Sequence, residues 1–188
     1  MLMVRYDLYK LVKEELGIGS KDLVTRPSGQ AIRVRIERDI EKEADGAVVA
    51  LDFTTIGVID YSCADEIVTK LVSRLLSNEY GDKYLLLIGL NENQKENIEV
   101  ALERKDLTIM AEMRDNSRVV LGKLNNYLKD TLDFIVKKKT ATSKDLSDAR
   151  KLEANTSGTR LLNLHKKRLV KRVEVVRAEG KILVYELL

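Results

Sequence analysis

The 188-residue sequence predicts a layered α/β domain followed by a smaller, mainly helical domain that ends in a β-hairpin. As far as residue 111, apolar runs alternate with amphipathic helical patterns, which is typical of a sheet flanked by helices. Beyond residue 118 the pattern changes to successive helices and then two strands. The charge changes too, because residues 1–118 carry a net charge of −5 and residues 119–188 one of +8. We therefore expect two domains, 1–118 and 119–188, with different partners; a chance imbalance of solvated charges is the alternative.

The first domain is expected to begin with a helix over residues 4–16, where apolar residues recur at helical spacing. Ser28 follows the single proline and is expected to cap a helix that extends to Ile40. The apolar run Val48–Phe53 predicts a strand covered on both faces, as in a parallel sheet. The further elements expected are a helix over 64–76, a strand over 84–88, a helix from Asn91 or Asn93 to Glu103, and a strand over 107–111. This order favours substantially parallel strands with right-handed crossovers.

The second domain is expected to begin after a polar stretch at residues 114–118. Apolar residues between Leu124 and Val136 then predict a long helix. The remaining elements expected are a short helix capped by Thr142 or Ser143, a helix that starts at Asn155 or Thr156, strands at 169–176 and 181–188, and a hairpin tip at 178–180.

Composition argues against several classes of protein and site. The longest apolar runs have about five residues, whereas a membrane-spanning helix needs about 20, so we expect no transmembrane segment. Charges within the first 16 positions argue against a signal peptide, and a cytoplasmic location is expected. The single cysteine and histidine, Cys63 and His165, cannot form a disulfide or a Cys/His zinc site within one chain. No phosphate loop, dinucleotide fingerprint or catalytic triad is present, so we expect no enzyme, catalytic residue, metal or cofactor.

The segment Ala141–Val170 combines a short helix, a turn and a second helix rich in Ser, Thr and Arg. With the hairpin that follows, the pattern over about residues 119–188 resembles the winged helix-turn-helix regulators related to the MarR family. That family often has glycine where this chain has Arg168, so the turn into the wing is expected to differ. The resemblance implies a duplex DNA-binding domain, whose DNA-binding residues would be Thr156, Ser157, Thr159, Arg160, Lys166, Lys167, Arg168, Arg177 and Lys181.

The chemistry of those residues agrees with the resemblance. Short hydroxyls can bond to phosphates, and arginine can donate two hydrogen bonds to a guanine edge. Lysine and arginine displace counterions from the phosphate backbone. The alternative is a winged helix that binds protein and whose charges are only solvated. His165 is expected to be a surface residue of the second helix.

The segment Leu51–Ile67 places a loop and the start of a helix directly after a buried strand. With Thr25–Gly29 upstream, it resembles the STAS-like domains of unknown function over about residues 20–115 and, more distantly, the STAS domains of anti-sigma-factor antagonists. The resemblance implies a module that binds proteins, often switch kinases of the Hsp90-like ATPase type, and in antagonists a phosphorylated Ser or Thr directly after a loop Asp. The partner-binding or switch residues here would be Asp60, Tyr61, Ser62, Asp65 and Glu66.

Tyr61 stands at the phosphoacceptor position of that motif. We expect the next residue, Ser62, to be a helix N-cap; its phosphorylation is the alternative and would add about −1.5 to −2 charges beside acidic residues. Cys63 is expected to be buried, the alternative being a thiol whose pKa the helix N-terminus lowers. An acid/base pair of Asp52 and Asp60 is not favoured, because no nucleophile or metal-ligand set converges on them.

These features favour a transcriptional regulator in which the STAS-like domain senses a signal or binds a partner and controls the DNA-binding domain. Such proteins usually act as homodimers. Helices 4–16 and 123–139 are the candidate dimer contacts, because their apolar stripes exceed what one small domain can cover. The alternative function is a non-enzymatic adaptor in a partner-switching pathway linked to a kinase or ATPase.

Overall fold

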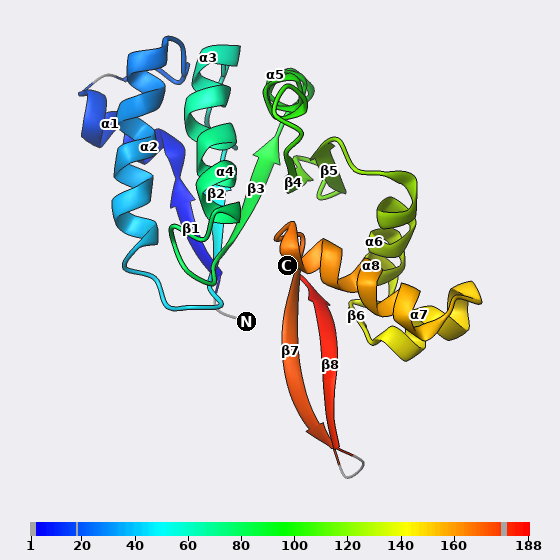
Figure 1. Ribbon diagram of the computed structural model, residues 1–188. Coiled ribbons are helices and arrows are strands. Elements are labelled where there is room, and N and C mark those ends of the chain that lie inside the picture. Colours follow the sequence, from blue (N-terminus) through cyan, green and yellow to red (C-terminus); the bar gives the residue numbers. More distant parts are fainter. Residues whose placement is uncertain (1–2, 18, 178–179) are drawn as a thin grey trace. The chain divides into compact units, whose positions relative to one another are not determined.

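The computed structural model describes residues 3–17, 19–177 and 180–188, with the backbone only at Arg177. The chain forms two compact units, Met1–Lys123 and Leu124–Leu188, called unit 1 and unit 2 below (Figure 1). The boundary expected at 118/119 lies just before the end of unit 1. The difference is strand β5 (Arg118–Gly122), which pairs with β4 (Thr108–Met113) and so belongs to unit 1.

Unit 1 contains a five-stranded, mostly parallel sheet in the order β1-β2-β3-β4-β5. Strands β1 (Met3–Asp7), β2 (Val48–Asp52), β3 (Tyr84–Leu90) and β4 are parallel, whereas β5 is antiparallel to β4. The pairing of β3 with β4 shifts register between Ile88 and Leu90. The sheet confirms the predicted α/β class and the predominance of parallel strands.

The helices of unit 1 share one apolar core with the sheet. They are α1 (Leu8–Leu16), α2 (Arg26–Ile40), α3 (Tyr61–Ala64), the π-helical turn η1 (Asp65–Thr69), α4 (Lys70–Leu76) and α5 (Glu92–Glu103). Alternate strand residues such as Val49, Leu51 and Leu87 belong to the same core as Ile36 of α2 and Ile67 of η1. Because side chains alternate across a strand, these helices pack on the sheet face that carries those residues.

The N-terminal element differs from the prediction of a helix over 4–16. Residues 3–7 form a strand along which exposed and half-buried residues alternate, and the helix begins only at Leu8. Asp7 marks the change, because its carboxylate accepts hydrogen bonds from the backbone N–H groups of Tyr9 and Lys10. The predicted Ser28 cap is also wrong: α2 already begins at Arg26, since Pro27 is suited to a first helical turn.

The polar residues 114–118 were expected to end the first domain, but they form the turn of a β-hairpin. The backbone N–H of Met113 donates to the carbonyl of Ser117, and Asn116 adopts a left-handed backbone with φ of 64°. Asparagine tolerates this conformation better than most residues. Sequence patterning also missed the strand that follows this turn, β5.

Unit 2 contains three helices and a small antiparallel sheet with strand order β6-β8-β7. Its elements are α6 (Asn126–Lys138), β6 (Thr140–Ala141), α7 (Ser143–Arg150), α8 (Ala154–Lys166), β7 (Val170–Arg177) and β8 (Gly180–Leu187). Thr142 caps α7 through a capping box with Asp145, which confirms one of the two predicted caps. Helix α8 starts at Ala154, one residue earlier than expected, with Glu153 before it. The predicted hairpin tip lies largely outside the described residues.

The apolar stripes of the two candidate dimer helices are covered by the chain itself. Leu8, Leu11 and Val12 of α1 belong to the core of unit 1. Leu128 and Leu132 of α6 are each only 2% exposed. The argument that these stripes need a second copy to cover them is therefore wrong. None of the helices in the described part of the chain is long and apolar enough to cross a membrane.

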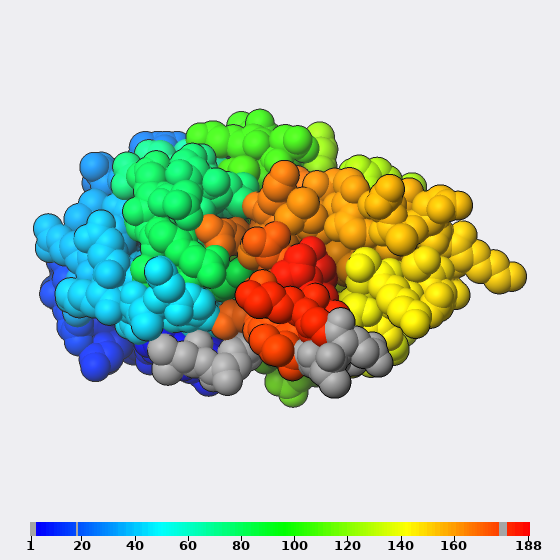
Figure 2. Space-filling view, turned by 60° about the horizontal axis from the view of Figure 1, so that its bottom comes forward, coloured from blue at the N-terminus to red at the C-terminus, as the bar shows by residue number. Residues whose placement is uncertain are grey.

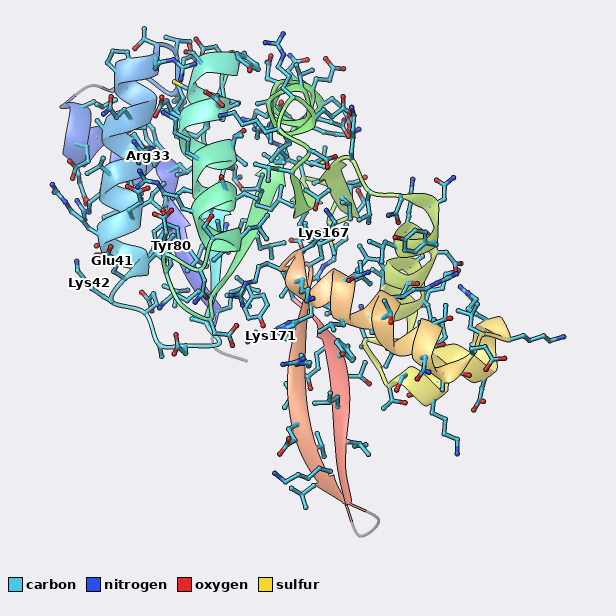
Figure 3. All side chains as sticks on the ribbon, in the orientation of Figure 1. Arg33, Glu41, Lys42, Tyr80, Lys167 and Lys171 are labelled. Carbon is cyan, nitrogen blue, oxygen red and sulfur yellow. The ribbon has the colours of Figure 1, made fainter. Side chains whose placement is uncertain are left out.

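A buried ionic cluster joins α2 to α4 in unit 1. The carboxylate of Glu37 accepts hydrogen bonds from Arg33 at 2.8 and 2.9 Å, from Arg74 at 2.7 Å and from the hydroxyl of Tyr80 at 2.8 Å. Arg33 is 6% exposed and Glu37 9%, and Figure 3 labels Arg33 and Tyr80 within unit 1. A buried charge is tolerated only when it is paired and hydrogen-bonded, so each member of the cluster depends on the others.

Candidate functional site

Helix α8 of unit 2 has one buried face and one polar face. Ser157, Leu161 and Leu164 are fully buried. On the opposite side, the exposed residues Asn155, Thr159 and Lys166 recur at helical spacing and form a polar stripe together with half-buried Asn163. Residues of α7 and α8, coloured yellow to orange, lie at the molecular surface in Figure 2. Because the apolar residues of α8 are confined to one narrow stripe, the opposite side of the helix carries polar residues.

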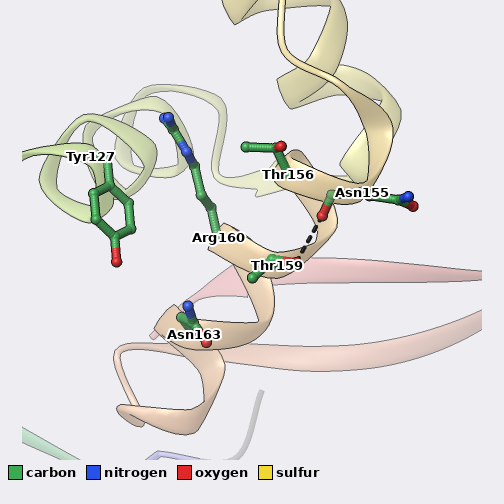
Figure 4. A pocket seen from close by; sticks show the side chains of 6 residues that line it. All are labelled: Tyr127, Asn155, Thr156, Thr159, Arg160 and Asn163. Carbon is green, nitrogen blue, oxygen red and sulfur yellow. Dashed lines mark hydrogen bonds between the residues drawn. The ribbon is translucent and has the colours of Figure 1, made fainter.

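A hollow of about 430 Å³ runs along this polar face and reaches the first turn of α6 (Figure 4). It is lined by Tyr127, Asn155, Thr156, Thr159, Arg160 and Asn163. The guanidinium of Arg160 lies 5.3 Å from the centre of the Tyr127 ring, a cation–π contact. Within the described residues, the Arg160 guanidinium forms no hydrogen bond, so its N–H groups remain available to a ligand.

Hydrogen bonds determine which of these side chains can act as donors. The hydroxyl of Thr159 donates to the carbonyl of Asn155 at 2.8 Å, so it can accept from a ligand but is committed as a donor. Within the described residues, the side-chain amides of Asn155 and Asn163 have no hydrogen-bond partner. An asparagine amide presents a donor and an acceptor side by side, the pattern that pairs with an adenine edge.

The predicted DNA-binding residues divide into three groups. Thr156 and Thr159 are exposed on α8, and Arg160 is half-buried beside them. Ser157 must be withdrawn, because it is fully buried and its hydroxyl faces the protein interior. Its positions four residues before Leu161 and seven before Leu164 place it on the buried face of the helix.

The predicted basic residues lie where α8 ends and in the hairpin. Lys166 is exposed, whereas Lys167 and Arg168 are half-buried; Lys167 is labelled in Figure 3. Arg168 has a left-handed backbone with φ of 57°, so a non-glycine residue adopts the conformation for which glycine is usual. Lys181 is exposed and forms an ion pair of 2.7 Å with Glu174. The side chain of Arg177 lies outside the described residues.

Sequence reasoning missed three residues of the hollow: Tyr127, Asn155 as a binding residue, and Asn163. The signal for the two asparagines was the spacing 155, 159 and 163, which places them on one helix face with Thr159. No local signal could have found Tyr127, because it belongs to another helix. His165, expected at the surface, is half-buried, and its Nδ1 lies 3.3 Å from the carbonyl oxygen of Val170.

In unit 1, Asp60 rather than Ser62 is the N-cap of α3. Its carboxylate accepts from the backbone N–H of Cys63 at 2.7 Å, from that of Thr25 at 3.2 Å and from the Ser62 hydroxyl at 2.9 Å. Burial alone would raise the pKa of Asp60, but these hydrogen bonds outweigh it and hold the pKa below its usual value. Ser62 is half-buried and serves the cap as a second donor.

Two of the predicted partner-binding residues face inward. Asp65 is 6% exposed and Glu66 2%, and both accept hydrogen bonds from Arg26, at 2.9 and 2.7 Å. They are therefore committed to an internal ion-pair cluster and must be withdrawn as an interaction surface. Tyr61 is half-buried beneath the guanidinium of Arg104, which lies 4.6 Å from its ring centre.

Cys63 is buried, as expected, and its thiol donates to the carbonyl of Thr25 at 2.9 Å. Burial, with the neighbouring Asp60 carboxylate, raises the pKa of the thiol to about 12, so the alternative of a lowered pKa is wrong. Asp52 is engaged elsewhere, because it accepts from Arg5 and from the backbone N–H of Thr54. Asp52 and Asp60 thus each have structural partners of their own.

Comparisons with known proteins add no family to this geometry. No model of a known protein family matches the chain, and no curated protein matches it. The functional argument therefore rests on the residues of the two units.

Proposed function

We propose that the chain is a DNA-binding regulator in which unit 2 binds duplex DNA and unit 1 controls that binding. The observation that carries the proposal is the polar face of α8. There, the amides of Asn155 and Asn163 have no hydrogen-bond partner among the described residues, and they flank the Thr159 methyl and Arg160, which contacts the Tyr127 ring. Such groups match base edges in the major groove. A helix rather than a loop presents them, which keeps their spacing constant.

The arrangement of unit 2 supports this proposal. We interpret its order of helix, short strand, two helices and hairpin, with sheet order β6-β8-β7, as that of a winged helix-turn-helix domain in which α8 would be the recognition helix. The unit is rich in lysine and arginine, which supply the affinity for phosphates that does not depend on sequence. Binding as a homodimer would fit a palindromic site.

Fluorescence anisotropy with the full chain tests the proposal. A random duplex and a genomic duplex pool are titrated across a salt series, where log K should fall by about 0.9 per log unit of salt for each phosphate contact. The double substitution Arg160→Ala/Asn163→Ala should weaken binding, whereas Asn93→Ala, an exposed asparagine of unit 1, should leave it unchanged. A folded protein that binds no duplex at low salt would refute the proposal.

A second candidate, the non-enzymatic adaptor, has its own observation. Val24 and Val58 are 45% and 46% exposed, and they flank the pairing of Leu23 with Ile59 beside the Asp60 cap. Exposed apolar residues next to a loop fit a protein-binding surface. A partner complex that survives high salt and is lost in Val58→Glu would favour the adaptor over the regulator.

A further inference from the structure

A second hollow, of about 290 Å³, lies at the carboxyl ends of the parallel strands of unit 1. Its lining includes Arg5 of β1, Thr54 after β2, Ile88 and Gly89 of β3, and Met113 and Arg114 at the end of β4. In open α/β sheets, ligands bind outside the carboxyl ends of the strands where the strand order reverses. The order β1-β2-β3-β4 does not reverse, so the case for a ligand site here rests on the groups that line the hollow.

The wall of the hollow is built by a bulge that requires glycine. Gly89 lies where the pairing of β3 and β4 shifts, with φ of 73°. A Cβ at this position would lie 2.1 Å from the hydroxyl oxygen of Thr54 and 3.0 Å from its backbone nitrogen. No side chain fits there, so the loop after β2 can pack directly on the bulge. Bulges of this kind occur next to binding sites, where they redirect backbone and side-chain groups.

The bulge and the loop together hold Arg114 at the mouth of the hollow. Its Nε donates to the carbonyl of Gly89 at 3.3 Å and its Nη2 to the carbonyl of Thr54 at 3.1 Å. Within the part of the chain that is described, no carboxylate lies within ion-pair distance of Arg114. Two carbonyl dipoles orient the guanidinium but leave its positive charge unbalanced, and its other N–H groups remain free to bind an anion.

The charge of the neighbouring arginine, Arg5, is paired with a carboxylate, so Arg5 lines the hollow without binding the anion. Arg5 donates through Nε and Nη2 to one oxygen of Asp52, at 2.9 and 2.6 Å. Burial would raise the pKa of Asp52, but hydrogen bonds from Thr54 and Arg5 hold it below its usual value, so the ion pair persists at neutral pH. Glu112, also in the lining, has its own cation, because Arg118 Nε lies 3.6 Å from its carboxylate.

We infer that this hollow binds a small organic anion, whose carboxylate or phosphate head lies on Arg114. The apolar side chains of Ile88 and Met113 line the same hollow and suit a short hydrocarbon body. Unit 1 then carries a ligand site of its own. This inference is independent of DNA binding by unit 2.

Titrations of the ¹⁵N-labelled full chain by NMR test the site, with three probes: sodium butyrate, inorganic phosphate and butylamine. Butyrate or phosphate should shift the amide signals of residues 54, 89 and 114–116 in a saturable way, whereas butylamine should not. Arg114→Gln should weaken binding at least tenfold. Its matched control is Arg38→Gln, which removes an exposed arginine from α2 and should bind as the parent chain does.

The outcomes separate the possibilities. Saturation by phosphate alone identifies a phosphate head, and saturation by butyrate alone a carboxylate head; either supports the site. The inference is overturned if neither anion gives saturable shifts up to ~20 mM, a concentration that would nearly saturate a site with a Kd of about 1 mM. It is also overturned if Arg114→Gln binds the anions as well as the parent chain does. Gly89→Ala provides a second check, since a Cβ that displaces Thr54 should also abolish binding.

Discussion

If α8 reads bases, the spacing of its two asparagines determines the pattern of the preferred site. Asn155 and Asn163 are eight residues apart in one helix, which corresponds to about 12 Å at 1.5 Å per residue. Successive base pairs are separated by about 3.4 Å, so the two amides span about three to four steps. Asparagine pairs with adenine and arginine with guanine. The selected duplex should therefore contain two adenines three to four steps apart, with a guanine near them on account of Arg160.

The size of each effect follows from the contacts. A bidentate contact contributes about 1–3 kcal/mol of base discrimination, so Asn163→Ala should lose roughly 5- to 150-fold preference at one adenine and little elsewhere. Tyr127 is 46% exposed, and an exposed cation–π contact contributes about 0.5–1 kcal/mol. Tyr127→Leu should accordingly reduce guanine preference only a few fold, whereas Tyr127→Phe should retain it.

Selection from a random duplex library, followed by competition anisotropy, measures these preferences. Duplexes that carry 7-deazaadenine lack the N7 acceptor and should lose the preference that Asn163 provides. Lys166→Ala is the matched control, because loss of a phosphate contact weakens all sequences equally and lowers the salt slope by about 0.9. The reasoning is refuted if the protein binds duplex DNA but Asn163→Ala and Arg160→Lys keep the same base preferences as the parent.

Three further predictions concern the two units separately. Glu37→Gln removes one of the two carboxylates beside buried Arg33 and leaves only Glu66, 3.5 Å from Arg33 Nε. It should destabilise unit 1 by up to about 3–5 kcal/mol in urea unfolding followed by circular dichroism; a cost below about 1 kcal/mol would contradict the buried cluster. Cys63 in the folded chain should react with iodoacetamide far more slowly at pH 8 than in urea, because burial raises its pKa to about 12; equal rates would show an open site. The Thr142 and Lys138 hydrogen bonds lower the pKa of Asp145 to about 2, so its contribution to unit 2 is present above about pH 4 and is lost as the pH falls toward 2. Asp145→Asn should remove that pH dependence, and an unchanged acid transition in this variant would refute the assignment.

Local patterns determined most elements of the chain. Continuous apolar runs identified β2 and β3, because parallel strands are buried on both faces. The helical spacing of leucines identified α6, and Thr142 was one of the two residues expected to cap α7. The first strand was missed because Val4 and Leu8 also fit a helical period, and only pairing with β2 makes residues 3–7 a strand.

The composition of α8 determined that the chain presents threonine, asparagine and arginine on one helix, but only tertiary structure decided which of them face outward. Ser157 carries the same chemistry as Thr159, yet packing of Leu161 and Leu164 turns it inward. Tyr127 meets Arg160, and Gly89 meets Thr54, across separations that no sequence period encodes. Hydrophobic periodicity specifies which face of an element is buried, whereas the identity of the neighbours depends on how the elements pack. The hollow on α8 and the hollow at the carboxyl ends of the strands of unit 1 are both of this second kind.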